Sequence, residues 1–160
     1  MKTLRTIGVY GFDRGAFIDA LEVAGIDLLL DVRQRRGVRG SEYAWANAQR
    51  LQDALAEAGI GYSHLKELAP TTEMRQLQYT EDARLGEGKR NRSVLAPAYV
   101  ERYSEEVLER VDLDPVVRWI GDSAAALLCV ERDPEACHRS LIAARLERDW
   151  GFEVEHLRPA

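Results

Sequence analysis

The sequence predicts a single α/β domain, in which helices flank a mainly parallel sheet in three layers of the Rossmann type. Short apolar segments alternate with amphipathic segments along the chain, which is the pattern of about five parallel strands joined by helices. The chain has 160 residues, the length of one domain, and it contains no internal repeat. Residues 26–32 are apolar on both sides of an extended chain, as buried parallel strands are.

The expected strands are short, rich in apolar and β-branched residues, and bounded by glycine or polar residues. They lie at residues 3–11, 26–32, 60–65, 124–131 and 152–157. Sequence alone does not determine the order of these strands in the sheet.

The expected helices carry apolar residues at helical spacing. They lie at residues 14–24, 42–58, 97–111, 115–120 and 134–150. Asp13 and Asp133 stand at positions suited to N-caps. Gly25 and Gly59 end the first two helices, since glycine readily adopts the left-handed conformation that closes a helix.

The helical pattern weakens between residues 66 and 96, apart from a helical piece expected over residues 72–79. Residues 81–93 are polar and include Gly86 and Gly88. Connections of this length in a compact domain are usually functional or mobile. We therefore interpret residues 66–96 as a long polar loop or lid within a single domain that spans residues 1–160.

The charge of the chain limits its partners. Lys and Arg number 22 and Asp and Glu 27, for a net charge of −5, which disfavours a protein that coats nucleic acid. No apolar run is long enough for a membrane span, and the N-terminus enters a strand with no signal peptide. Cys129 and Cys137 cannot form a disulfide framework, so we expect a cytoplasmic protein without a membrane partner.

Ligands of parallel α/β sheets bind beyond the carboxyl ends of the strands. This rule selects residues 10–13, 31–40 and 129–139. We therefore expect these segments to meet at one edge of the sheet.

The last of these segments carries the sharpest chemical pattern. Cys129 and Glu131 alternate onto one strand face, while Cys137, His138 and Arg139 are expected in the first turn of the next helix. Free N–H groups and the helix dipole there favour an anion and lower the pKa of a thiol. We interpret Cys137 or Glu131 as the nucleophile or base, His138 as a proton carrier, and Arg139 as a hydrogen-bond donor to the anion. Cys129 is expected to be a buried apolar residue, and Cys137 suits either packing or function.

The second segment concentrates positive charge. Arg33, Arg35, Arg36 and Arg39 follow one another with no acidic residue among them. Guanidinium groups bind phosphate and carboxylate bidentately, so a pocket for such anions is one interpretation. The other is a solvated loop whose arginines pair with the surplus acidic residues. Asp31 could orient Arg33 or bind a metal ion, and orientation is the simpler assumption.

A metal site would require several donor side chains to meet, and the available ones are Cys129, Glu131, Cys137 and His138. This happens only if the short loop between the strand and the helix folds back. The spacing matches no standard zinc pattern, and we therefore predict neither a metal ion nor a cofactor. The sequence also contains no P-loop, GxGxxG, HExxH or GxSxG motif.

The chain as a whole resembles the domain-of-unknown-function family 488. The resemblance rests on Thr6-Ile7-Gly8, residues 25–33 and 58–68, and, most specifically, residues 128–142 with Cys129, Glu131, Cys137, His138 and Arg139. It implies a small cytoplasmic α/β protein of prokaryotic type and no established activity. Relatives often carry a His directly after Thr-Ile-Gly, where this chain has Val9 and Tyr10, so the resemblance implies that this chain has either lost that His or replaced it with Tyr10. Relatives also have a Pro-containing loop where this chain has Gln34-Arg35-Arg36-Gly37.

Together these observations predict a protein that binds or acts on a small anionic, phosphate- or nucleotide-like ligand at the carboxyl edge of the sheet. The predicted ligand-binding residues are Arg33, Arg36, Arg139, Asp31 and Tyr10, and the predicted catalytic residues are Cys137, His138 and Glu131. One alternative is a non-catalytic nucleic-acid-binding or regulatory module that uses residues 33–39 and 89–92. A weaker alternative is metal binding by the cysteine, glutamate and histidine side chains. The sequence leaves open whether the protein is an enzyme and whether it forms oligomers.

Overall fold

A five-stranded, all-parallel sheet forms the centre of the structure, a computed structural model that describes residues 2–160. The strands are β1 (Thr3–Ile7), β2 (Leu28–Asp31), β3 (Gly61–His64), β4 (Ala125–Leu128) and β5 (Glu153–Leu157). Their order in the sheet is β3-β2-β4-β1-β5, and every neighbouring pair is parallel. The predicted α/β fold class is therefore confirmed.

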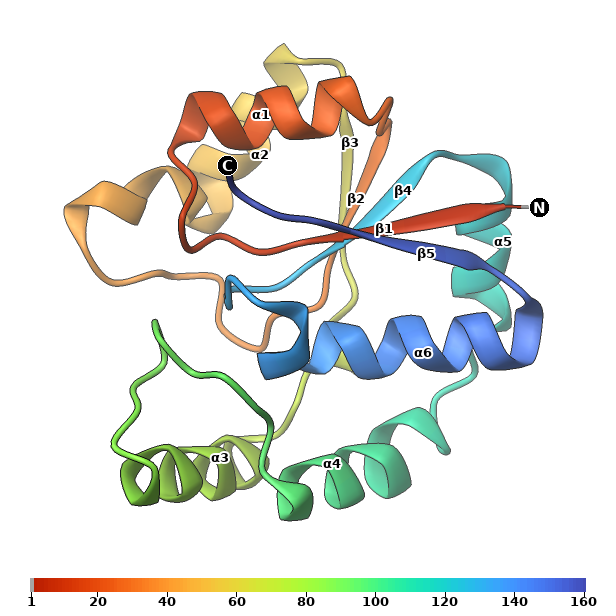
Figure 1. Cartoon of the computed structure of the whole chain (residues 1–160). Coiled ribbons are helices and arrows are strands. Elements are labelled where there is room, and N and C mark those ends of the chain that lie inside the picture. Colours follow the sequence, from red (N-terminus) through yellow and green to blue (C-terminus); the bar gives the residue numbers. More distant parts are fainter. Residues whose placement is uncertain (1) are drawn as a thin grey trace.

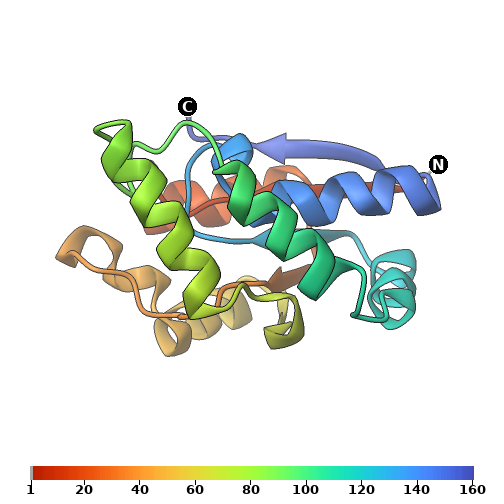
Figure 2. The same cartoon turned by 90° about the horizontal axis from the view of Figure 1, so that it is seen from below.

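Helices cover both faces of this sheet. They are α1 (Arg14–Val23), α2 (Ala48–Glu57), α3 (Thr72–Arg84), α4 (Pro97–Tyr103), α5 (Asp114–Asp122) and α6 (His138–Trp150). Figure 1 shows α1 and α2 on one face, and α3, α4 and α6 on the other. Figure 2 looks directly onto the second group, in which α4 lies between α3 and α6. None of the helices within residues 2–160 has the length and apolar character that crossing a membrane requires.

Two predicted helices begin elsewhere than expected. The segment 42–58 is divided at Asn47, whose extended backbone separates a 3₁₀ turn (Ser41–Ala46) from α2. Asn47 Oδ1 accepts a hydrogen bond from the Val38 amide at 2.7 Å, and this bond ties the junction to the preceding loop. The helix predicted to start at Pro134 begins instead at His138, because Cys137 is extended (φ −140°, ψ 144°). Asp133 makes no capping bond, whereas Asp13 caps α1 as predicted, 2.8 Å from the Ala16 amide.

Helix α3 continues to Arg84, beyond the helical piece expected over residues 72–79. Its last turns bury two polar side chains, and Gln78 donates a hydrogen bond to Asp82 at 2.9 Å. A pattern of apolar residues does not reveal a helix that turns polar side chains inward, and this is why the helix is longer than its apolar residues predict. That residues 66–96 act as a lid stays a prediction.

The strands end together at the edge where the loops of interest begin. Strand β4 lies between β2 and β1, and its residues are completely buried. Hydrogen bonds continue past the strands: the Cys129 amide donates to Ile7 O at 3.2 Å, and the Tyr10 amide donates to Val130 O at 3.0 Å. The segments after β1, β2 and β4 are thereby held side by side.

Gly8 is a sensitive point of this edge. A Cβ atom at Gly8 would lie 2.0 Å from Glu131 O and 2.9 Å from Glu131 C. Because the backbone would have to shift, we expect Gly8→Ala to lower the free energy of unfolding by about 1–3 kcal/mol, measured by urea denaturation. Gly15→Ala is the control, since its Cβ would meet only Asp13 Oδ1, at 3.6 Å, within a helix. Equal stabilities of the two variants would contradict the close approach.

Candidate functional site

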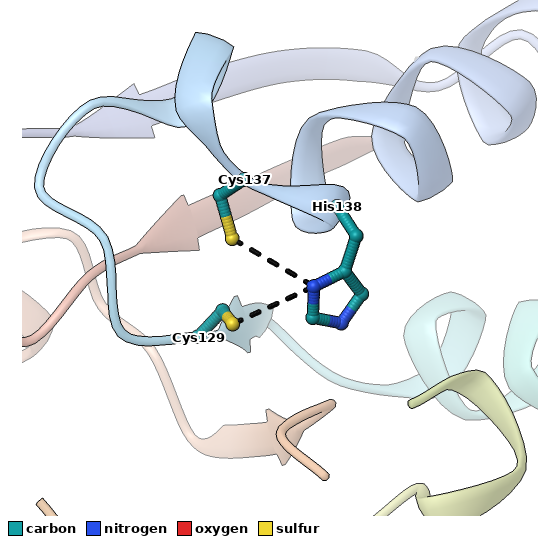
Figure 3. Close-up of side chains that lie close together, drawn as sticks. All are labelled: Cys129, Cys137 and His138. Atoms are coloured by element: carbon teal, nitrogen blue, oxygen red, sulfur yellow. Dashed lines mark hydrogen bonds between the residues drawn. The ribbon is translucent and has the colours of Figure 1, made fainter. Parts of the chain in front are cut away.

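Cys129, Cys137 and His138 come together at the carboxyl edge of the sheet (Figure 3). Cys129 directly follows β4, and the chain returns through a 3₁₀ turn (Pro134–Ala136) to Cys137 and the first residue of α6. The two sulfur atoms and a ring nitrogen of His138 lie within 4.8 Å of one another. All three side chains are buried. Their proximity shows that the short loop between β4 and α6 folds back and brings these predicted residues together.

A backbone carbonyl fixes the orientation of the His138 ring. His138 Nε2 lies 2.8 Å from Val32 O, and a carbonyl can only accept, so Nε2 carries the proton. In the neutral ring Nδ1 is then an unprotonated acceptor. Nδ1 lies 3.6 Å from Cys129 Sγ and 3.9 Å from Cys137 Sγ, as the dashed lines in Figure 3 mark.

The two thiols have different proton affinities. Burial raises the pKa of Cys129 well above its ordinary value, and Cys137 beside it adds to the effect. Burial alone would also raise the pKa of Cys137, but hydrogen bonding from Cys129 and the charges of Arg139 and His138 lower it well below the ordinary value. Burial lowers the pKa of His138, and its contact with Cys137 outweighs this and raises it.

Glu131 stands on the same side of the chain as Cys129, as the alternation predicts. Its Oε2 atom lies 3.6 Å from Cys129 Sγ, and its Oε1 atom accepts a hydrogen bond from Arg92 Nη1 at 2.8 Å. Burial raises the pKa of Glu131, and Cys137 raises it further. Arg92 is itself held by Asp82 of α3, whose Oδ2 atom lies 2.7 Å from Arg92 Nη2.

The sequence contains no signal for the Arg92–Glu131 pair. The two residues are far apart in the chain, and Arg92 lies in a polar segment that resembles a solvated loop. Only the buried Asp82 on α3 explains why this arginine turns inward.

Arg33 and Asp31 form a buried ion pair. Asp31 Oδ1 and Oδ2 accept hydrogen bonds from Arg33 Nε at 2.9 Å and Nη2 at 2.8 Å, which confirms that Asp31 orients Arg33. Arg33 Nη1 donates to Ala46 O at 2.9 Å, and Tyr62 donates to Asp31 Oδ2 at 2.6 Å. The guanidinium is therefore neutralised by Asp31, and the protein itself holds its hydrogen-bond donors.

The other predicted ligand-binding residues form no hydrogen bond with Cys129, Cys137 or His138 in the described part of the chain. Arg139 is fully buried and donates to two backbone carbonyls, Glu131 O at 2.6 Å and Arg132 O at 3.1 Å. Arg36 donates to the Tyr62 hydroxyl at 3.3 Å. Tyr10 lies farther out, where its ring contacts Arg90 with a distance of 5.6 Å from the guanidinium carbon to the ring centroid.

Two connected hollows open at this edge. The first, which we call the inner pocket, has a volume of about 40 Å³ and is lined by Cys129, Glu131, Cys137 and His138 together with Arg33 and Arg92. Since one water molecule needs roughly 10–15 Å³ on this scale, the pocket admits only a few waters or one small chemical group. The second, the outer groove, measures about 970 Å³. The residues that line both hollows are Arg35, Arg75, Tyr79 and Lys89.

The outer groove is cationic. Its charged lining residues are Arg35, Arg39, Arg75, Lys89 and Arg90, and no Asp or Glu lines it. In the described part of the chain, residues 2–160, the side chains of Arg35 and Lys89 form no hydrogen bond or ion pair with protein. The sequence did not single out Arg75, because one arginine on a helix carries no distinctive pattern.

The fold and the site define a parallel α/β protein in which a cationic groove leads to a buried cysteine–histidine cluster. The chain belongs to the family described as domain of unknown function DUF488, whose model matches residues 13–146. The resemblance found in the sequence is therefore confirmed. No curated protein and no solved structure matches the chain.

The Asp31–Arg33 pair is expected to be a strong determinant of stability. Arg33→Met leaves a buried carboxylate without its cation, which should cost about 3–5 kcal/mol in the free energy of unfolding. The double variant Asp31→Asn/Arg33→Met removes that unpaired charge and keeps an acceptor for Tyr62, so it should recover much of the loss. Urea denaturation of the three proteins measures both effects. A loss below about 1 kcal/mol for Arg33→Met, typical of exposed ion pairs, would contradict the prediction.

Proposed function

We propose that the protein binds a phosphate-bearing anionic ligand of nucleotide size in the outer groove and presents one end of it to the inner pocket. The observation that supports this most directly is the lining of the groove by five cationic side chains and no carboxylate. On a chain whose net charge is −5, such a separation of charge favours an anion at this place.

The size and composition of the groove support a nucleotide-like ligand. Its volume of about 970 Å³ is at the upper end of the usual range for small-molecule sites, roughly 300–1,000 Å³. Arginine side chains match phosphate oxygens bidentately. The ring of Tyr79 is 40% exposed and lies beside Arg75, where a base could stack on it.

The proposal assigns the chemistry to the inner end of the groove. Glu131, Cys137 and His138 would act on the part of the ligand that enters the inner pocket, whose small volume admits only a projecting group. Arg33 and Arg92 line this pocket, and each is paired with carboxylates of the protein, Arg33 with Asp31 and Arg92 with Asp82 and Glu131. Arg139 would position the loop through its bonds to two carbonyls rather than touch the ligand. We further infer a cytoplasmic protein, because both cysteines are free thiols.

Nucleic acid is the second candidate ligand, and one observation favours it. Arg90 lies against the rings of Tyr10 and Tyr43, at 5.6 and 5.1 Å from the ring centroids. Proteins that bind single strands combine cationic grooves with aromatic residues in this way. A single strand of nucleic acid would need the outer part of the groove, whereas a nucleotide needs only the part shared with the inner pocket.

Binding of adenosine triphosphate labelled with a fluorophore on its ribose tests the proposal. We expect binding that weakens with added salt and is displaced by inorganic triphosphate but not by adenosine. Arg35→Ala/Lys89→Ala should weaken it by about tenfold or more, since each hydrogen bond to a charged group contributes about 1.5–3 kcal/mol. Fluorescence anisotropy measures all of these affinities.

The matched control is Arg118→Ala, an exposed arginine of α5 that lies outside the groove. Absence of binding at low salt, or an equal effect of the control and the double variant, would refute the proposal. Tighter binding of a labelled single-stranded oligonucleotide, lost on Arg90→Ala, would instead support the nucleic-acid candidate.

A further inference from the structure

We propose that Cys129, Cys137 and His138 bind one divalent transition-metal ion of the zinc type at the base of the inner pocket, with the fourth position toward Glu131. The ligand atoms are the two Sγ atoms and His138 Nδ1, which lie within 4.8 Å of one another. This inference goes beyond the proposed ligand groove, because none of the groove cations takes part in it. In the inner pocket, a bound ion would replace free Cys137 and His138 as the group that meets the ligand.

The distances between these donors fit a tetrahedral ion. Zinc binds thiolate at about 2.3 Å and imidazole at about 2.0–2.1 Å, so a sulfur–nitrogen edge of the tetrahedron measures about 3.6 Å. The two sulfur–nitrogen distances in the cluster are 3.6 and 3.9 Å. A sulfur–carboxylate edge is also about 3.6 Å by the same lengths. Cys129 Sγ and Glu131 Oε2 lie 3.6 Å apart.

With a neutral His138 ring, hydrogen bonds to Nδ1 do not account for both sulfur contacts. His138 Nδ1 has one lone pair in the ring plane, yet both sulfur atoms lie beside it. Only one thiol can donate to that lone pair, whereas a cation at the centre would bind all the donors together.

The surroundings of the donors are those of metal ligands. Ligating histidines usually donate their second N–H to a carbonyl or carboxylate, as His138 does to Val32 O at 2.8 Å. Glu131 is oriented in a comparable way, because Arg92 holds Oε1 and leaves Oε2 toward the cysteines. Tyr103 packs edge-on against the imidazole, 5.3 Å between centroids, and shields it from solvent.

The charges also balance. Two thiolates and the Glu131 carboxylate around a divalent ion leave a single negative charge, and Asp82, which pairs with Arg92, adds a second. The positive charges of Arg92 and Arg139 offset these two. Buried thiolates would be costly without such compensation. The sequence predicted no metal because the spacing of the cysteines fits no zinc pattern. The turn at Pro134–Ala136 meets the condition that the loop folds back.

The metal content of the whole chain, purified under reducing conditions without chelator, is the first test. Elemental analysis should find about one equivalent of zinc or a related ion. Cobalt(II) added to chelator-treated protein should produce a thiolate-to-metal charge-transfer band and the intense visible bands of a tetrahedral ion. Added zinc should raise the melting temperature, because it binds only the folded state.

Single variants assign the ligands. Cys129→Ser, Cys137→Ser and His138→Gln should each remove or strongly shift the cobalt bands and weaken zinc binding by more than about a hundredfold, beyond the usual effect of an outer-shell change. Glu131→Gln should weaken it by about ten- to hundredfold and keep the charge-transfer band. The control His156→Gln changes a histidine of β5 outside the cluster and should leave cobalt binding unchanged. Competition with a chromophoric chelator measures these affinities.

Two results would overturn the proposal, and they do not depend on the stability of any variant. One is reduced wild-type protein with no transition metal and no cobalt charge-transfer band. The other is a set of cobalt bands that Cys137→Ser leaves unchanged in a folded protein. The variant Arg35→Ala/Lys89→Ala should bind zinc like the wild type. If the wild-type protein binds metal but no nucleotide, only the proposed groove is refuted. If it binds nucleotide but no metal, only the proposed metal site is refuted.

Discussion

The ion pair between Asp31 and Arg33 is the constraint on which the carboxyl edge of the sheet depends. Both side chains are buried at the end of β2, and their two hydrogen bonds hold the backbone of the residue between them, Val32. The Val32 carbonyl in turn orients His138, and the Arg33 carbonyl accepts a hydrogen bond from His64 at 2.8 Å. The geometry of the cysteine–histidine cluster therefore depends on an ion pair that forms no hydrogen bond with either cysteine.

A second constraint connects α3 to the inner pocket. Arg92 bridges Asp82 and Glu131 across buried space, so the segment that follows α3 supplies both a groove cation, Lys89, and the partner of the pocket carboxylate. The outer groove and the inner pocket consequently share walls.

The arginines of this chain serve two different purposes. Arg33, Arg92 and Arg139 are buried and bound to carboxylates or carbonyls, where they hold loops in place. Arg35 and Arg39 are exposed and line the groove. The sequence suggested one cationic edge, and the structure divides it into arginines that bond to the protein, among them Arg33 and Arg139, and arginines that line the outer groove.

The sequence by itself determined the alternation of strands and helices, the edge of the sheet where the candidate site lies, and the grouping of Cys137, His138 and Glu131. These features follow from hydrophobic periodicity and from neighbours a few residues apart. Only the tertiary structure decided the strand order, the return of the loop that places Cys129 beside His138, and the bond between Arg92 and Glu131. The physical reason is that a buried polar group takes whichever partner the packing brings to it, and that partner can lie anywhere in the chain.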